Sequence, residues 1–159
     1  MSVIPRFVTV YRGSSNQSIA NNTWVTVLFN VIETDGDSDV MYTSNNGNFI
    51  APQAGWYDIE AQITWASAQS AAIRIIHGGN TSLPVLIRSN PTAQSNNSIK
   101  HRIYLGVNDF VQVQVRQNSG GAVNILATLD PFTAGQPGRT TNAIFTLIRP
   151  SDTVIFNAF

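Results

Sequence analysis

The residues of this chain best suited to metal chemistry lie in one short acidic segment. Asp35, Asp37 and Asp39 alternate with a glycine and a serine, and Glu33 lies just before them. Calcium in proteins takes six to eight oxygen ligands, so carboxylates at alternate positions can form part of a site. An EF-hand loop also has a glycine at its sixth position and a glutamate at its twelfth, and this segment has neither. A calcium half-site and a solvated acidic loop both stay open, and the missing ligands favour the loop.

The two histidines offer little catalytic potential. His77 and His101 each lie in an alternating pattern, in phase with isoleucines, and no motif brings carboxylates to them. We therefore predict packed or interface histidines. The chain has no Gly-x-Ser-x-Gly nucleophile elbow, no glycine-rich phosphate loop and no cysteine. Because no set of nucleophile, base and orienting residue is recognisable, we expect no enzyme activity and no cofactor besides the calcium considered above.

The composition is unusually poor in charge. Charged residues make up 11% of the chain, against about 25% in an average domain. The formal net charge is zero, which argues against a nucleic-acid binder. Asn, Gln, Ser and Thr together supply a third of the residues, and Lys100 is the one lysine. Such a surface suits permanent neighbours or a partner held by hydrogen bonds. Compositional drift in a β-rich protein is the alternative.

The elements that must position these residues are all strands. In Gly55–Trp65, the residues Tyr57 to Trp65 alternate strictly between apolar and polar, which predicts a long half-buried strand. Turn signals recur along the chain, with a tight turn at Asn45-Asn46-Gly47. The other predicted strands are Arg6–Arg12, Trp24–Val31, Phe49–Ile50, Ala71–His77, Pro84–Arg88, Ser98–Leu105, Phe110–Gln117, Ala122–Leu129 and Thr141–Arg149. Loops are predicted at Gly13–Asn22, Glu33–Asp39, Asn90–Asn97 and Asp130–Arg139. About ten strands with hairpin spacing predict an all-β sandwich or jelly roll.

A chain of 159 residues suits one domain. We divide it into an N-terminal arm (1–6), a domain (7–149) and an apolar C-terminal tail (150–159). Residues 1–20 contain no basic start followed by an apolar run, so no secretory signal is expected. No apolar stretch approaches the roughly 20 residues of a membrane helix, so no membrane insertion is expected.

The order of several motifs resembles C1q-like domains. The run Phe49-x-x-Pro52-x-x-Gly55-Trp56-Tyr57 is similar to the start of that family's long central strand. Further matches are Trp24–Phe29, the Leu105–Val113 segment, the turn at Asn118–Gly121 and the closing strand Phe145–Ile148. The resemblance implies a ten-stranded jelly roll shared with the tumour necrosis factor fold. It also implies a compact homotrimer that binds or scaffolds.

Two departures from the C1q-like pattern matter. The usual Gly-Asp pair reads Asn108-Asp109, and no collagen-like stalk precedes the domain, which weakens analogies with vertebrate complement or adipokine roles. Some C1q-like trimers bind calcium, but their ligand positions do not match this sequence residue by residue.

Two segments are expected to contact partners. The apolar residues of the tail either cover the sandwich's own edge or dock on a neighbouring subunit; they are Val154, Ile155, Phe156 and Phe159. Trp24 and Leu28 lie opposite Val25, Val27 and Phe29, so that strand is apolar on both faces. A sandwich strand needs one apolar face, and the second is therefore predicted to meet another subunit of the homotrimer.

These features predict a trimeric structural or surface-binding protein on a virion, such as a phage capsid decoration or fibre head. Virions leave cells by lysis, so their proteins need no signal peptide, and an amide-rich surface suits contacts with other virion proteins. The alternative is an extracellular lectin-like module that binds a host glycan or a cell-surface receptor. Its loops would be Gly78–Asn97 and Asp130–Arg139, where Arg88 and Arg139 could hydrogen-bond hydroxyls. The two functions overlap, because a virion protein can bind host glycans.

Overall fold

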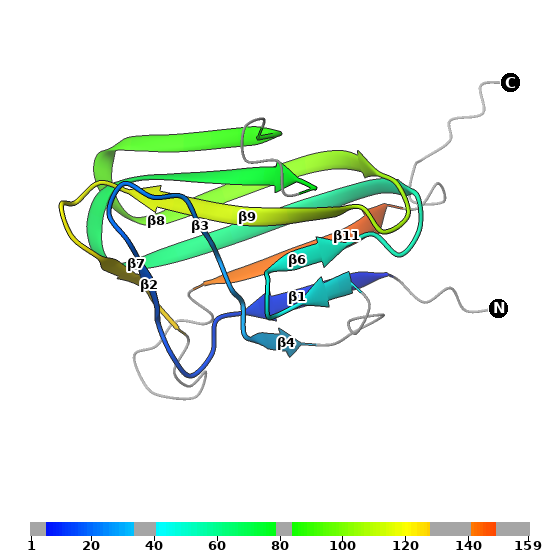
Figure 1. Ribbon diagram of the computed structural model, residues 1–159, viewed down its shortest axis with the longest axis horizontal. Helices are drawn as coiled ribbons and strands as arrows, with labels where there is room; N and C mark the ends of the chain where they lie inside the picture. Colours follow the sequence, from blue (N-terminus) through cyan, green and yellow to red (C-terminus); the bar gives the residue numbers. More distant parts are fainter. Residues whose placement is uncertain (1–5, 34–40, 79–83, 128–140, 149–159) are drawn as a thin grey trace, which may run out of the picture.

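The computed structural model describes residues 6–33, 41–78, 84–127 and 141–148, and this part of the chain is all-β (Figure 1). Two strands are much longer than the others, β7 (Gly55–His77) and β8 (Leu86–Leu105). The remaining strands are β1 (Phe7–Tyr11), β2 (Gln17–Ile19), β3 (Val25–Thr26), β4 (Val31–Glu33), β5 (Tyr42–Thr43), β6 (Asn48–Ile50), β9 (Phe110–Gln117), β10 (Val123–Ile125) and β11 (Asn142–Ile148). No helix among the described residues has the length and apolar character needed to cross a membrane.

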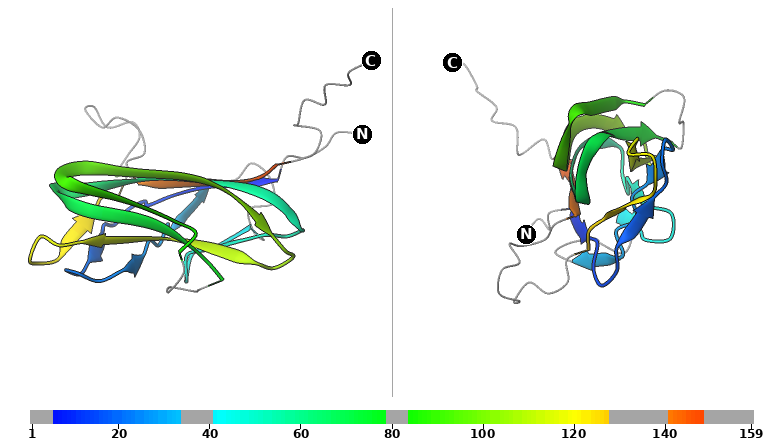
Figure 2. Two further views of the ribbon diagram at one scale, coloured as in Figure 1. Left: turned by 90° about the horizontal axis from the view of Figure 1, so that it is seen from above. Right: turned by 90° about the vertical axis from the view of Figure 1, so that its left-hand side faces the viewer.

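The strands form two layers that share the long strands β7 and β8 (Figure 2). The β1 layer contains β4, β1, β11, the first half of β7 and the second half of β8. The β9 layer contains the first half of β8, the second half of β7, β9, β6 and β5, with β3 also paired to β9. Both long strands therefore pass from one layer to the other. This arrangement is the jelly roll that the sequence predicted.

The core lies between the layers, and the alternation of β7 creates its largest part. Tyr57, Ile59, Ile63 and Trp65 are buried, as predicted. The ring of Tyr57 stacks on Phe145 of β11 at 4.8 Å between centroids. In the first half of β7, the same alternation places every second side chain on the outer face of the β1 layer.

The continuity of β7 and β8 differs from the prediction. Gly55–Trp65 and Ala71–His77 are one strand, and the predicted loop Asn90–Asn97 is part of β8. The regular register breaks between Thr64 and Gln69, where the ladder has a β-bulge. A bulge bends a strand without ending it, which lets both long strands turn from one layer into the other.

The segment before β4 also differs from the prediction. The predicted strand Trp24–Val31 is interrupted after Thr26, and the predicted loop Gly13–Asn22 contains β2. Side chains replace the missing ladder partners: the backbone N–H of Leu28 donates to Gln17 Oε1 at 2.9 Å, and that of Phe29 donates to Tyr42 Oη at 2.9 Å. The inward face was predicted correctly, because Val27 and Phe29 are buried. The tight turn at Asn45–Gly47 is confirmed, with Gly47 at φ +73°.

Candidate functional site

The outer face of the β1 layer exposes three large apolar side chains. Trp56 and Tyr104 are 53% and 54% exposed, and Ile144 is 37% exposed. Trp56 and Tyr104 are cross-strand partners whose ring centroids lie 5.6 Å apart at 76°. Ile144 pairs with Glu60, two rows along the same face. Strands hold these side chains in fixed positions, so they form an ordered exposed apolar patch, a feature that marks interaction sites.

Cross-strand ion pairs lie between and beside these apolar residues. Arg102 donates two hydrogen bonds to the carboxylate of Asp58, at 2.8 and 3.0 Å. Lys100 Nζ lies 3.8 Å from Glu60 Oε2. The hydrogen bonds from Arg102 hold the pKa of Asp58 below its usual value. The face therefore combines an aromatic pair with charges that are already neutralised within the subunit.

The histidines are not brought together. His77 Nε2 lies 3.4 Å from Asp109 Oδ2 in a partly exposed pair at the end of β7. His101 lies opposite Ile59, on the core side of the β1 layer's edge strand, as its isoleucine phase predicted. Across the described residues, no group of three or more His, Cys, Asp or Glu side chains could hold a metal ion.

Most of the partner and metal residues predicted from the sequence lie outside the described residues. These are Asp35, Asp37, Asp39, Arg139, Val154, Ile155, Phe156 and Phe159. Arg88 is described, and it lies exposed on β8 beside Glu60 and Lys100, where the three line a hollow of about 270 Å³. The segment Gly78–Asn97 was predicted as a loop, and its second part is instead a strand, because β8 begins at Leu86.

A second hollow, which the sequence did not indicate, lies on the outer face of the β9 layer. Its volume is about 270 Å³, and Arg116, Ala72 and Ser89 form one cross-strand row in its lining. The full lining is Asn22, Trp24, Ser70, Ala71, Ala72, Ser89, Asn90, Arg116, Gln117 and Asn118. We call this hollow the Trp24 cavity. The small side chains of Ala72 and Ser89 leave room beside the longer Arg116.

Trp24 has a partner within its own subunit. The guanidinium carbon of Arg74 lies 4.1 Å from the centroid of the Trp24 ring. Arg74 is buried and donates from Nε and Nη2 to Gln114 Oε1, at 2.9 and 2.6 Å. Burial lowers the pKa of Arg74, and the nearby charge of Arg116 lowers it further. Trp24 therefore packs against Arg74 of its own subunit and also lines the cavity.

The wall of the Trp24 cavity is held by a buried amide. Gln117 is 1% exposed, and its Nε2 donates to the carbonyls of Ile19 and Gly121 at 3.0 and 2.7 Å. Its Oε1 accepts from the Ser119 backbone N–H at 2.8 Å. Asn22, at φ +56°, donates its backbone N–H to the Gln117 carbonyl. These bonds hold the 118–121 turn against residues 19–22, which follow directly from β2, so this wall of the cavity is preformed.

Comparisons with known proteins agree with this architecture. Three similar structures are Eiger TNF from S. frugiperda, the PRD1 vertex protein P5 and the globular domain of zebrafish complement 1qA. Eiger TNF is 12% identical and has a TM-score of 0.60, with 91% of this chain and 94% of that chain covered. P5 is 16% identical and has a TM-score of 0.62, with 93% of this chain and 100% of that chain covered. The complement domain is 16% identical and has a TM-score of 0.57, with 91% of this chain and 98% of that chain covered.

At these identities the structural likeness shows the fold alone. No curated protein matches the sequence. The family model of the C1q domain, however, matches residues 9–133. Because this match covers most of the chain, the protein belongs to the C1q domain family.

Proposed function

We propose that this protein is a non-enzymatic C1q-like homotrimer that serves as a structural or surface-binding component of a virus particle, as a capsid decoration or fibre head. The observation that carries the proposal is the outer face of the β1 layer. It holds Trp56, Tyr104 and Ile144 exposed on a regular sheet. Domains of the C1q and TNF-like fold commonly form trimers, and this face supplies the apolar contact that such an assembly needs.

The chemistry of this face suits a permanent contact between copies. Aromatic residues are enriched in the centres of protein interfaces, and charges there need partners to be buried without a large penalty. Asp58 has its partner Arg102 on the neighbouring strand, so it can be covered without leaving an unpaired charge. The low overall charge, 11% of residues, gives copies little electrostatic reason to stay apart.

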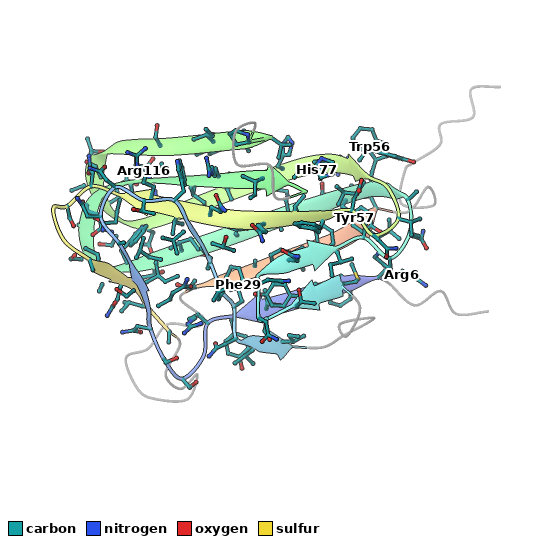
Figure 3. The ribbon with its side chains drawn as sticks, viewed as in Figure 1. Arg6, Phe29, Trp56, Tyr57, His77 and Arg116 are labelled. Carbon is teal, nitrogen blue, oxygen red and sulfur yellow. The ribbon has the colours of Figure 1, made fainter. Side chains whose placement is uncertain are left out.

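Two observations support a place on a particle. The PRD1 vertex protein P5 shares the fold along its whole length. Figure 3 also places Arg6 and Arg116 at opposite ends of the domain, and β11 ends at the Arg6 end. An anchor formed by the chain termini would thus leave the Arg116 end pointing away from a shell. We propose the tail Asp152–Phe159 as this anchor and the virion surface as the location.

The assembly is tested by light scattering of the purified protein. We expect a mass three times the 17.3 kDa of one chain. Trp56→Ser combined with Tyr104→Ser should shift the mass toward one chain. Val107→Ser is the matched control, because Val107 is 60% exposed but lies in the turn after β8, outside this face. A wild-type monomer at micromolar concentration would refute the trimer.

The particle role is tested by removing residues 152–159. We expect the shortened protein to remain trimeric but to stop co-sedimenting with particles from the same lysate, whereas the full chain co-sediments. Full-length protein that never co-sediments with any particle contradicts the virion role and leaves the lectin-like alternative. That alternative is favoured by one specific observation, the preformed Trp24 cavity.

A further inference from the structure

The lining of the Trp24 cavity combines positive charge with neutral hydrogen-bonding groups. Arg116 is exposed, and its described hydrogen bond goes to the neutral amide of Asn22, over 3.3 Å. The buried guanidinium of Arg74 lies behind Trp24. No Asp or Glu of the described residues lines the cavity. Arg116 therefore gives the cavity a positive charge that no lining carboxylate of the described residues balances.

The described carboxylates all lie elsewhere in the molecule. Asp58 and Glu60 are on the outer face of the β1 layer, and Glu33 is on β4 of that layer. Asp109 lies beside His77. Figure 3 shows His77 and Arg116 toward opposite ends of the domain. Among the described residues no carboxylate forms an ion pair with Arg116, so its planar guanidinium can bind a ligand carboxylate.

The remaining residues of the lining suit a sugar ring. Trp24 offers an apolar ring surface, against which the C–H faces of a pyranose can pack. Asn22, Asn90, Asn118 and Ser89 supply amides and a hydroxyl, which can donate to and accept from sugar hydroxyls. The volume of about 270 Å³ is near the lower bound of small-ligand sites, roughly 300 Å³, which suits a single sugar residue.

From these features we propose that the Trp24 cavity binds a saccharide residue that carries a carboxylate, such as a sialic or uronic acid. Arg116 binds the carboxylate, Trp24 packs against the ring, and the amides and Ser89 contact the hydroxyls. The cavity lies on the β9 layer, away from the face proposed for assembly, and at the end away from Arg6 (Figure 3). The inference deepens the surface-binding part of the proposed function.

The test is isothermal titration of the full-length protein with 3′-sialyllactose, with lactose as the neutral control. We expect sialyllactose to bind and lactose to bind at least tenfold more weakly, the scale of one charge-assisted contact. Arg116→Gln should weaken sialyllactose binding at least tenfold. Arg6→Gln removes the same charge at the opposite end of the domain (Figure 3) and should leave the affinity unchanged.

A second acidic saccharide, digalacturonic acid, tests whether the carboxylate alone is recognised, because it shares this group with sialic acid but lacks the other substituents. Binding of either acidic saccharide that depends on Arg116 supports the proposal. It is overturned if neither binds at millimolar concentration, if lactose binds equally well, or if Arg116→Gln has no effect. Binding of a Glu-rich peptide in place of both saccharides also overturns it.

Failure here can be told apart from failure of the proposed trimer. Arg116 lies on the β9 layer, so Arg116→Gln should keep the wild-type mass in light scattering and the wild-type co-sedimentation. A trimer that co-sediments with particles but binds no acidic saccharide rejects this inference alone. A monomer that binds sialyllactose through Arg116 rejects the assembly alone.

Discussion

The indole Nε1–H of Trp65 donates a 2.6 Å hydrogen bond to Oδ1 of Asn97, and both side chains are buried. The bond joins β7 to β8 beside Thr64 and Asn96, the last regular pair before the register breaks. It thus fixes the two long strands to each other where they leave the β1 layer. Trp65 is the largest buried side chain, and the hydrogen bond to Asn97 satisfies its one polar atom.

Replacing Asn97 by Leu should destabilise the protein by about 1–3 kcal/mol, because the buried indole N–H loses its acceptor. Asn96→Ala is the control, since Asn96 accepts an exposed hydrogen bond from Thr64 and should change stability by less than about 0.5 kcal/mol. Urea unfolding followed by tryptophan fluorescence, at one fixed protein concentration, measures both. Equal effects of the two substitutions would show that the Trp65 bond is unimportant.

Tyr42→Phe should cost about 1–3 kcal/mol, because it removes a hydroxyl that serves two buried backbone groups. Tyr42 Oη donates to the Phe29 carbonyl at 3.0 Å and accepts from the Phe29 N–H at 2.9 Å. Burial also raises the pKa of Tyr42, so its contribution is complete below the ordinary tyrosine pKa of about 10 and is lost at higher pH. The melting temperature of the wild type should therefore exceed that of Tyr42→Phe by more at pH 7 than at pH 11.

Substitution of Phe145 should lower the stability of the fold, whereas substitution of its neighbour Ile144 should weaken the assembly. Phe145 is fully buried between Tyr57 and Phe49, so Phe145→Ala should cost about 3–5 kcal/mol in unfolding. Ile144 faces outward, so Ile144→Ser should leave the circular dichroism spectrum unchanged and lower the trimer mass on dilution. An Ile144→Ser protein that dilutes like the wild type would place the subunit contact on another face.

Acid should weaken the protein partly through Asp58. Its pKa is lowered in the folded state by the hydrogen bonds from Arg102, so the carboxylate stabilises the fold above its ordinary pKa of about 4. That stabilisation is lost as the pH falls through the folded-state pKa. Asp58→Asn should therefore be less stable than the wild type at pH 6, and the difference should vanish near pH 2. Glu60→Gln should change stability less at pH 6, because the Lys100 contact is longer and exposed.

Calcium removal should have no effect on stability if the acidic segment is a solvated loop. We expect the same melting temperature in 5 mM CaCl₂ and in 5 mM EDTA, concentrations on the order of those that saturate weak extracellular sites. The triple variant Asp35→Asn, Asp37→Asn, Asp39→Asn should melt alike in both buffers. A calcium-dependent rise that the triple variant lacks would establish a metal site there.

The sequence by itself determined the longer strands in which buried and exposed residues alternate strictly. The alternation of Gly55–Trp65 and Phe110–Gln117 predicted the corresponding strands of the core, and the Asn45–Gly47 turn followed from local backbone preferences. The ordered motifs around Gly55 and Leu105 likewise predicted the C1q-like fold. These signals are local, so they can be recognised in the sequence without knowing which strands pair.

Tertiary structure alone decided the rest. Residues 92–96 are exposed on β8, so they carry no apolar alternation, and only pairing with β7 makes that part of the chain a strand. Strand β2 was missed as well, because Ile19 is its one large apolar residue, whereas its partner β10 lies within the predicted strand Ala122–Leu129. Trp24 lies just before β3, Ser89 on β8 and Arg116 on β9, and they meet through the registers of β3, β7, β8 and β9. Register is set by long-range hydrogen bonding and core packing, and residue types along one segment do not encode it.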